Sequence, residues 1–170
     1  WSRFTTKNPE AKVILRNLTL TSTQETGTWN SYDITLNCNV DLENVELLKA
    51  VAFDGDKTTV NVKNVTIKES HDYYAIRISA AGQTVNIENL VIESACRGIM
   101  IDEQYVNDAV AKVTLNINNA KFTTANKAAI MVKSAKGADI TLQNVDITAV
   151  KKDTLYPVWV DEDAAAYADL

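Results

Sequence analysis

Three charged side chains have the types needed for acid–base chemistry: Arg77, Asp54 and Asp102. Removal of a proton beside a carboxylate, as in a polysaccharide lyase, needs a base and a cation that stabilises the resulting enolate. Hydrolysis of a glycosidic bond instead needs two carboxyl groups about 5 to 9.5 Å apart. Arg77 between the two aspartates could serve the first reaction, and the aspartates alone could serve the second.

The same charges also fit a purely structural interpretation. Asp102, Lys133 and Asp161 occupy equivalent positions in the repeat described below, and their signs alternate. Opposite charges on neighbouring strands are favourable cross-strand pairs. A solvated charge ladder is therefore the alternative to a catalytic site.

A second candidate site is an apolar stripe formed by Met100, Met131 and Trp159. Exposed apolar patches tend to be binding sites, and flat aromatic rings suit sugar rings. Arg77, at the equivalent position of an earlier repeat, and Tyr105, in a variable loop, would extend the ligand-binding surface. The alternative is that a terminal segment or a neighbouring domain covers the stripe.

A sequence repeat indicates which elements position these residues. Apolar residues stand four and two places before an asparagine, and one and three places after it. Alternation with a period of two predicts strands, and the phase change at the asparagine predicts a bend. We expect the asparagines to point inward and to form a hydrogen-bonded ladder. They are Asn17, Asn44, Asn64, Asn89, Asn119 and Asn144, spaced by 27, 20, 25, 30 and 25 residues.

A further strand is predicted between these units, which gives three short strands in each coil. Its second and fourth residues are apolar and should point inward, whereas the third and fifth should point outward. The aligned segments are 50–54, 75–79, 98–102, 129–133 and 157–161. The outward columns are Ala52, Arg77, Met100, Met131 and Trp159, and Asp54, Ser79, Asp102, Lys133 and Asp161.

These patterns predict an all-β fold, a right-handed parallel β-helix of about six coils with an internal asparagine ladder. The whole chain, residues 1–170, would form a single domain with coils over about 11–162 and terminal or capping segments at 1–10 and 163–170. Neither terminal segment is a strong cap, which suggests that the natural protein continues beyond one end. Leucine-rich repeats are the competing repeat class, although their asparagine follows a different spacing.

The coil length and the asparagine at a turn resemble the pectin-lyase-like right-handed β-helix superfamily, over about residues 11–162. The resemblance implies an extracellular or cell-surface protein and an active-site cleft on the face that carries Arg77. The sequence departs from the enzymes, because their paired aspartate motifs are missing and Glu162 follows Asp161 where a pectate lyase has histidine. The only histidine, His71, lies in a predicted loop.

We therefore expect a non-catalytic, adhesin-like bacterial module that binds a polysaccharide or a surface protein. A polysaccharide lyase or glycoside hydrolase is the alternative, and a structural spacer without a ligand is a third possibility. The net charge of −5 disfavours nucleic acid as a partner. No apolar run is long enough to span a bilayer.

No cofactor is expected, with calcium as the alternative. Asp54-Gly55-Asp56 begins like a calcium loop but lacks the later ligands. The two cysteines, Cys38 and Cys96, fall about three coils apart and should be free thiols.

Overall fold

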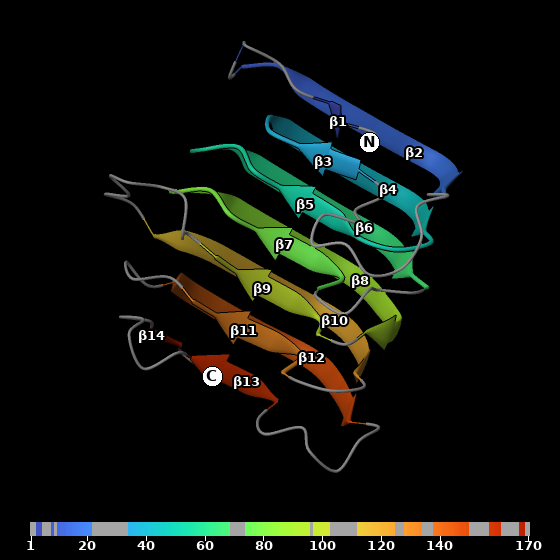
Figure 1. Ribbon diagram of the computed structural model, residues 1–170, viewed down its shortest axis with the longest axis vertical. Helices are drawn as coiled ribbons and strands as arrows, with labels where there is room; N and C mark the ends of the chain where they lie inside the picture. Colours follow the sequence, from blue (N-terminus) through green and yellow to red (C-terminus); the bar gives the residue numbers. More distant parts are fainter. Residues whose placement is uncertain are drawn as a thin grey trace.

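The computed structural model describes residues 3–4, 8, 10–21, 34–68, 74–95, 97–102, 112–124, 128–133, 138–149, 157–160 and 167–168. Every regular element in these ranges is a β-strand, and all the strand pairs are parallel. Short and long strands alternate along the chain and belong to two separate seven-stranded sheets (Figure 1). The predicted all-β class is confirmed.

The short-strand sheet contains mostly three-residue strands. In spatial order they are β1 (Arg3–Phe4), β3 (Ile34–Leu36), β5 (Val51–Phe53), β7 (Ile76–Ile78), β9 (Ile99–Ile101), β11 (Ile130–Val132) and β13 (Val158–Val160). The long-strand sheet runs β2 (Lys12–Leu20), β4 (Asn39–Leu47), β6 (Thr59–Ile67), β8 (Thr84–Ala95), β10 (Val113–Thr124), β12 (Ala138–Ala149) and β14 (Tyr167–Ala168).

The register of the long strands is the one that the repeat predicts. Val60 pairs with Val40 on one side and with Val85 on the other, so equivalent positions of successive repeats lie side by side. The same holds from β2 to β12. Equivalent side chains therefore form columns that run along the stack, perpendicular to the strands.

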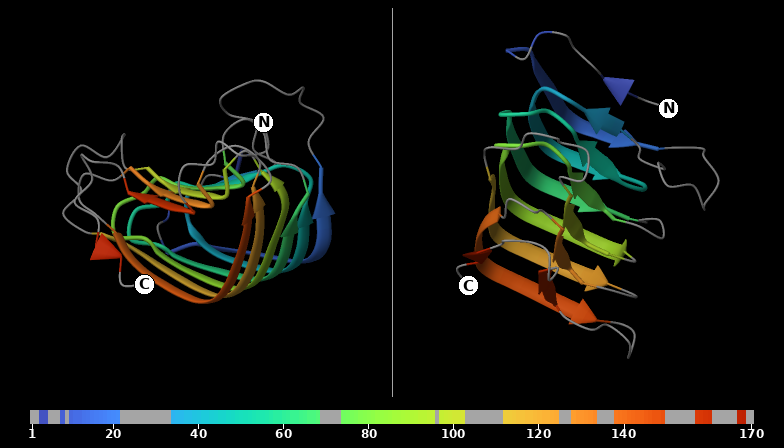
Figure 2. Two further views of the ribbon diagram at one scale, coloured as in Figure 1. Left: turned by 90° about the horizontal axis from the view of Figure 1, so that it is seen from below. Right: turned by 60° about the vertical axis from the view of Figure 1, so that its left-hand side comes forward.

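Each strand of this sheet from β2 to β12 continues through its asparagine, so these repeats have two strands and the expectation of three is wrong. The asparagines have a left-handed backbone, with φ between 52° and 60°. The long strands are bent, and the short strands lie opposite the bend (Figure 2). One residue in this conformation turns the chain while the residues on both sides keep their pairing with the neighbouring strands.

The apolar side chains between the two sheets form the main core. Its largest fully buried members include Phe53, Phe122, Leu42 and Ile76. The inward residues of β2, and those of β12 from Leu142 onward, are only partly buried. The core is thus built by stacking, and it thins out at both ends.

Parallel sheets of alternating short and long strands are consistent with a β-helix or another solenoid. A leucine-rich repeat would instead contribute one strand and a helical segment per repeat. The described ranges contain no helix, and hence none with the length and apolarity needed to cross a membrane.

Candidate functional site

The two outward columns predicted on the short-strand sheet are present. Arg77 pairs in register with Ala52 and with Met100, and Met131 pairs with Met100 and with Trp159. The second column follows the strand ends, where Asp54, Ser79, Asp102 and Lys133 each donate a backbone N–H to the preceding short strand. Asp161, the last predicted member, falls outside the described residues.

The three candidate acid–base residues reach one face, but their surroundings differ from those of a catalytic pair. Asp54 and Asp102 follow β5 and β9, with β7 between them, so they lie about 9.6 Å apart at ~4.8 Å per strand. Ser79 stands between them and donates a hydrogen bond to Asp54. Asp102 is only 8% exposed, and Arg77 is partly buried. The separation lies at the upper limit for two carboxyl groups that flank a glycosidic bond.

The expectation of an exposed apolar stripe is wrong. Met100 and Met131 are 4% and 2% exposed, and Trp159 is partly buried against them. Tyr74 and Ala128 complete this second apolar cluster, on the outer side of the short-strand sheet. The Tyr74 ring lies 5.0 Å from the Arg97 guanidinium carbon, and its hydroxyl accepts a hydrogen bond from Arg97 at 2.6 Å. Met100 and Met131 are therefore covered by other parts of the chain.

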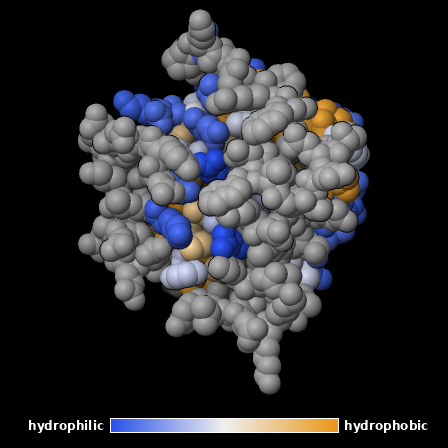
Figure 3. Space-filling view, viewed as in Figure 1, coloured by the Kyte–Doolittle hydropathy of each residue, from blue (hydrophilic) through white to orange (hydrophobic). Residues whose placement is uncertain are grey.

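On the outer side of the short-strand sheet, the described side chains include both hydrophilic and hydrophobic ones (Figure 3). Two other predicted features, Tyr105 in the ligand-binding set and the lone His71, lie outside the described residues.

The repeated asparagines form a hydrogen-bonded column at the bend, which we call the corner ladder. In each bond, Nδ2 of one asparagine donates to Oδ1 of its counterpart in the preceding repeat. The donor–acceptor pairs are Asn44–Asn17 at 2.9 Å, Asn64–Asn44 at 2.9 Å, Asn89–Asn64 at 2.7 Å and Asn119–Asn89 at 2.6 Å. Asn144 donates instead to Asn118, at 3.2 Å.

The corner ladder faces outward, so the expectation of an inward, buried ladder is wrong. Asn64 and Asn119 are exposed, and Asn89 is partly exposed. The apolar residues two places before and one place after each asparagine point inward. Two successive residues between them, the asparagine and its predecessor, must therefore point outward. The left-handed backbone makes this possible while the pairing on both sides is retained.

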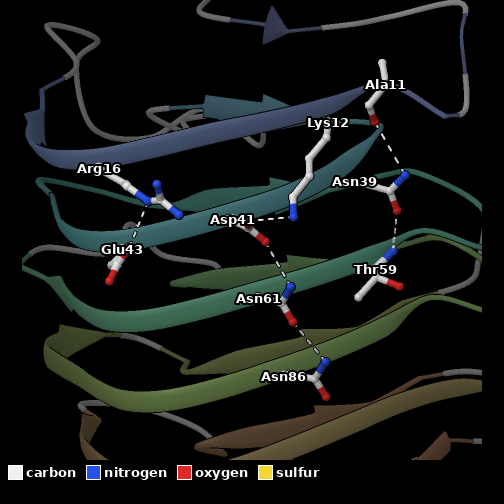
Figure 4. Close-up of polar contacts among 9 residues, drawn as sticks. All are labelled: Ala11, Lys12, Arg16, Asn39, Asp41, Glu43, Thr59, Asn61 and Asn86. Carbon is white, nitrogen blue, oxygen red and sulfur yellow. Dashed lines mark hydrogen bonds and ion pairs between the residues drawn. The ribbon is translucent and has the colours of Figure 1, made fainter.

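A second ladder, which the sequence analysis missed, runs beside the first on the same outer face. It consists of Asp41, Asn61, Asn86 and Asn116, each three residues before a corner asparagine. Asn61 donates to Asp41 at 2.9 Å, Asn86 to Asn61 at 3.1 Å, and Asn116 to Asn86 at 3.0 Å (Figure 4 shows the first two). We call this column the side ladder. The recurring Asp/Asn-x-x-Asn spacing would have revealed it.

An ion pair closes the N-terminal end of the side ladder. Asp41 lies 2.6 Å from Lys12 Nζ and accepts the hydrogen bond from Asn61 (Figure 4). Partial burial alone would raise the pKa of Asp41. The hydrogen bonds from Asn61 and Lys12, with the charges of Lys12 and Arg16, outweigh burial and lower it. Asp41 therefore stays ionised as the terminal acceptor of the side ladder.

Charged side chains form a third outward column, between the two ladders. Arg16 pairs with Glu43 at 2.8 Å, and Lys63 pairs with Glu88 at 3.1 Å. Towards the C-terminal end the column continues with the uncharged Asn118 and Gln143. The charges thus cancel within the column, and the face carries no excess of either sign there.

A surface groove of about 260 Å³ lies between the side ladder and this charged column. Its floor is formed by Val62, Ile87 and Ile117, which belong to the core. Its walls are the polar side chains of two outward columns, contributed by β6, β8, β10 and β12. These wall residues are Asn61, Asn86, Asn116, Lys63, Glu88, Asn118, Thr141 and Gln143.

The described ranges bring together no group of three or more His, Cys, Asp or Glu side chains that could hold a metal ion. In the calcium-like segment, Asp54 accepts the Ser79 hydroxyl and Asp56 accepts the backbone N–H of Ala81 at 3.0 Å. Both carboxylates therefore serve as hydrogen-bond acceptors for other parts of the chain. Cys38 is buried and free, and burial raises its pKa.

Comparison of this chain with protein-family models, with curated proteins and with solved structures gave no match.

Proposed function

We propose that this chain is a right-handed parallel β-helix module of about six coils that binds an uncharged polysaccharide without acting on it. The binding site is the groove between the side ladder and the charged column. The observation that supports this most directly is the run of amide side chains, one per strand, along the wall of the groove. The resemblance to pectin-lyase-like proteins further suggests an extracellular or cell-surface location.

The chemistry of the amides suits hydroxyl groups. An asparagine offers two N–H donors and a carbonyl oxygen with two lone pairs. Within the side ladder, Asn86 uses one N–H to donate to Asn61 and one lone pair to accept from Asn116. One donor and one acceptor position remain for a ligand. Sugar hydroxyls both donate and accept, so each repeat offers them the same pair of contacts.

The spacing and charge of the groove restrict the ligand further. Amides recur at the strand spacing of about 4.8 Å, which favours a linear polymer lying along the stack over a compact ligand. Lys63 and Glu88 neutralise each other at 3.1 Å, so an acidic polymer would gain little attraction. The groove has no aromatic residue in its lining, and we expect weak binding, with Kd of about 1 mM, or ~4 kcal/mol.

Isothermal titration with soluble neutral polysaccharides, such as dextran, xyloglucan and mannan, tests this proposal. Asn86→Ala removes one ladder amide, and the loss of about 1 kcal/mol should weaken binding roughly fivefold. Thr66→Ala, an outward change on the same sheet outside the groove, is the matched control and should leave binding unchanged. Binding should be insensitive to added salt, because the ligand has no charge to be screened.

The outcomes separate the alternatives. Absence of binding to every neutral polysaccharide at millimolar concentration would refute the proposal. Binding that Asn86→Ala leaves intact would place the site elsewhere. Release of shortened or unsaturated products, abolished by Arg77→Ala, would show a polysaccharide-degrading enzyme instead.

A further inference from the structure

The side-ladder wall of the groove runs straight along the stack. Asn61 pairs in register with Asn86 on the next strand, and Figure 4 shows these two amides in line. Asn116 pairs with Asn86 on one side and with Thr141 of β12 on the other. The register irregularity between β8 and β10 lies beyond Phe122, outside the groove. Each strand therefore adds one polar side chain to this wall, at the equivalent position.

The opposite wall has the same register. Lys63 pairs with Glu88, and Asn118 pairs with Glu88 on one side and with Gln143 on the other. Lys63 and Glu88 form an ion pair, whereas Asn118 and Gln143 carry no charge. Both walls thus offer one hydrogen-bonding side chain on each of the four strands that form the groove.

The groove is consequently a straight track with a fixed step and a limited length. Neighbouring strands are about 4.8 Å apart, so the three steps from β6 to β12 span about 14 Å. A ligand can repeat the same contacts at every strand only if its hydroxyl groups recur at this step along a straight line. A coiled polymer would leave both walls after one or two strands.

The linkage between sugar rings decides which neutral polysaccharides are straight. In 1,4-linked β-glucans and β-mannans, both linkage bonds of each ring are equatorial, and the chain is an extended ribbon. It advances one ring over a distance only slightly longer than the strand spacing. Successive rings are turned over, so hydroxyl groups project from both edges of the ribbon. In a 1,4-linked α-glucan one linkage bond is axial, and the chain coils. An extended chain also loses less conformational freedom when it binds.

From the common register of the two walls we infer that the ligand is an extended, unbranched 1,4-linked β-glycan, with about four consecutive rings in the groove, one on each strand. This inference rests on the proposed function and adds the linkage and the length of the ligand to it. The small excess of the ring spacing over the strand spacing accumulates along the chain, and a short track of four strands keeps it small. Further rings lie outside the groove and contribute little.

NMR titration of isotope-labelled protein with cello-oligosaccharides and malto-oligosaccharides of two to six rings tests the inference. Both series contain glucose alone and differ only in the linkage. Each added ring of the cello series up to the fourth should lower Kd roughly threefold, the effect of about one modest hydrogen bond, and later rings should add little. Maltotetraose should bind no more tightly than cellobiose. Backbone amide signals of β8 and β10 should shift during the cello titrations.

Thr141→Ala shortens the side-ladder wall by one position. Thr141 is exposed and is the last side chain of this wall. The variant should bind cellotetraose about threefold more weakly than the wild type and cellotriose equally well, because three rings still fit on β6, β8 and β10. Thr59→Ala is the matched control. Thr59 is also an exposed threonine, on β6 two residues before Asn61, but it does not line the groove. This control should keep the wild-type dependence on chain length.

The outcomes separate this inference from the proposed function. Equal affinity for cellotetraose and maltotetraose, or no gain in affinity between two and four rings of the cello series, would overturn the inference while binding of neutral polysaccharides stands. Equal weakening by Thr141→Ala and Thr59→Ala would likewise overturn the placement of one ring on each strand of the groove. Absence of binding to every neutral oligosaccharide and polysaccharide would refute both.

Discussion

The left-handed conformation of the corner residues explains why asparagine recurs there. Asn44, Asn64, Asn89 and Asn119 have φ values of 53°, 52°, 59° and 60°. Residues with a Cβ atom avoid this region at a cost of about 1–2 kcal/mol, and asparagine is a recognised exception. Its amide also donates to the preceding repeat and accepts from the next. Asparagine thus both tolerates the left-handed backbone of the bend and forms the hydrogen bonds along the stack.

Substitution of Asn89 separates these two contributions. Asn89→Gly keeps a residue that tolerates the left-handed backbone and loses the ladder amide, so we expect a loss of about 1 kcal/mol. Asn89→Ala loses the amide and also strains the backbone, for a total of about 2–3 kcal/mol. Urea unfolding of both variants measures the difference. An alanine variant as stable as the glycine variant would show that the backbone conformation contributes nothing.

At the scale of elements, the short strands depend on close approach of neighbouring backbones. Gly98 lies just before β9, where its N–H donates to Ala128 and its carbonyl accepts from Ala75 and Ile76. An added Cβ atom would collide with the carbonyl oxygen of Ala129 and would lie 2.8 Å from the Phe122 ring. The carbonyl belongs to the backbone of the adjacent repeat and has little room to move.

Gly98→Ala should therefore destabilise the protein by about 1–3 kcal/mol, the usual cost of overpacking. Thermal unfolding followed by circular dichroism measures the effect. Ala75→Gly, at the equivalent place before β7, is the control. It adds no atoms and should cost at most about 1 kcal/mol, through the flexibility of the unfolded chain. A Gly98→Ala protein as stable as the wild type would contradict the close packing of β9 against β11.

At the scale of the whole molecule, a stacked fold should be most stable in its middle. Each repeat contacts only the repeats beside it, so an end repeat lacks half of its contacts. Leu18 and Leu90 occupy the same inward column, yet Leu90 is 1% exposed and Leu18 is only partly buried. The two leucines thus report on the end and on the middle of one continuous core.

Leu90→Ala should cost about 2–5 kcal/mol, the range for a leucine removed from a packed interior. Leu18→Ala should cost about 1 kcal/mol, because less of its surface is buried. Urea unfolding of the two variants provides the comparison. Equal costs at the two positions would show that the β2 end is covered as well as the middle.

The sequence by itself determined the columns of this protein. Alternation of apolar residues shows which side chains of a strand share a face, and the repeated asparagine aligns one repeat with the next. Val40, Val60 and Val85 therefore pair as their positions in the repeat require. The outward column with Arg77 and Met100 was predictable for the same reason. Each of these results depends only on periodicity within the chain.

Only the tertiary structure decided how the outer faces are covered, which way the asparagine side chains point and where a groove forms. Periodicity assigns Met100 and Met131 to an outer face but does not reveal that they are buried there in a cluster with Tyr74 and Ala128. It shows that the chain bends at each asparagine, but the left-handed backbone made the asparagine side chains point outward. The groove beside the side ladder arises because two outward columns run side by side across four strands. Packing between residues distant in sequence depends on distances in space, and a pattern of residue types does not contain them.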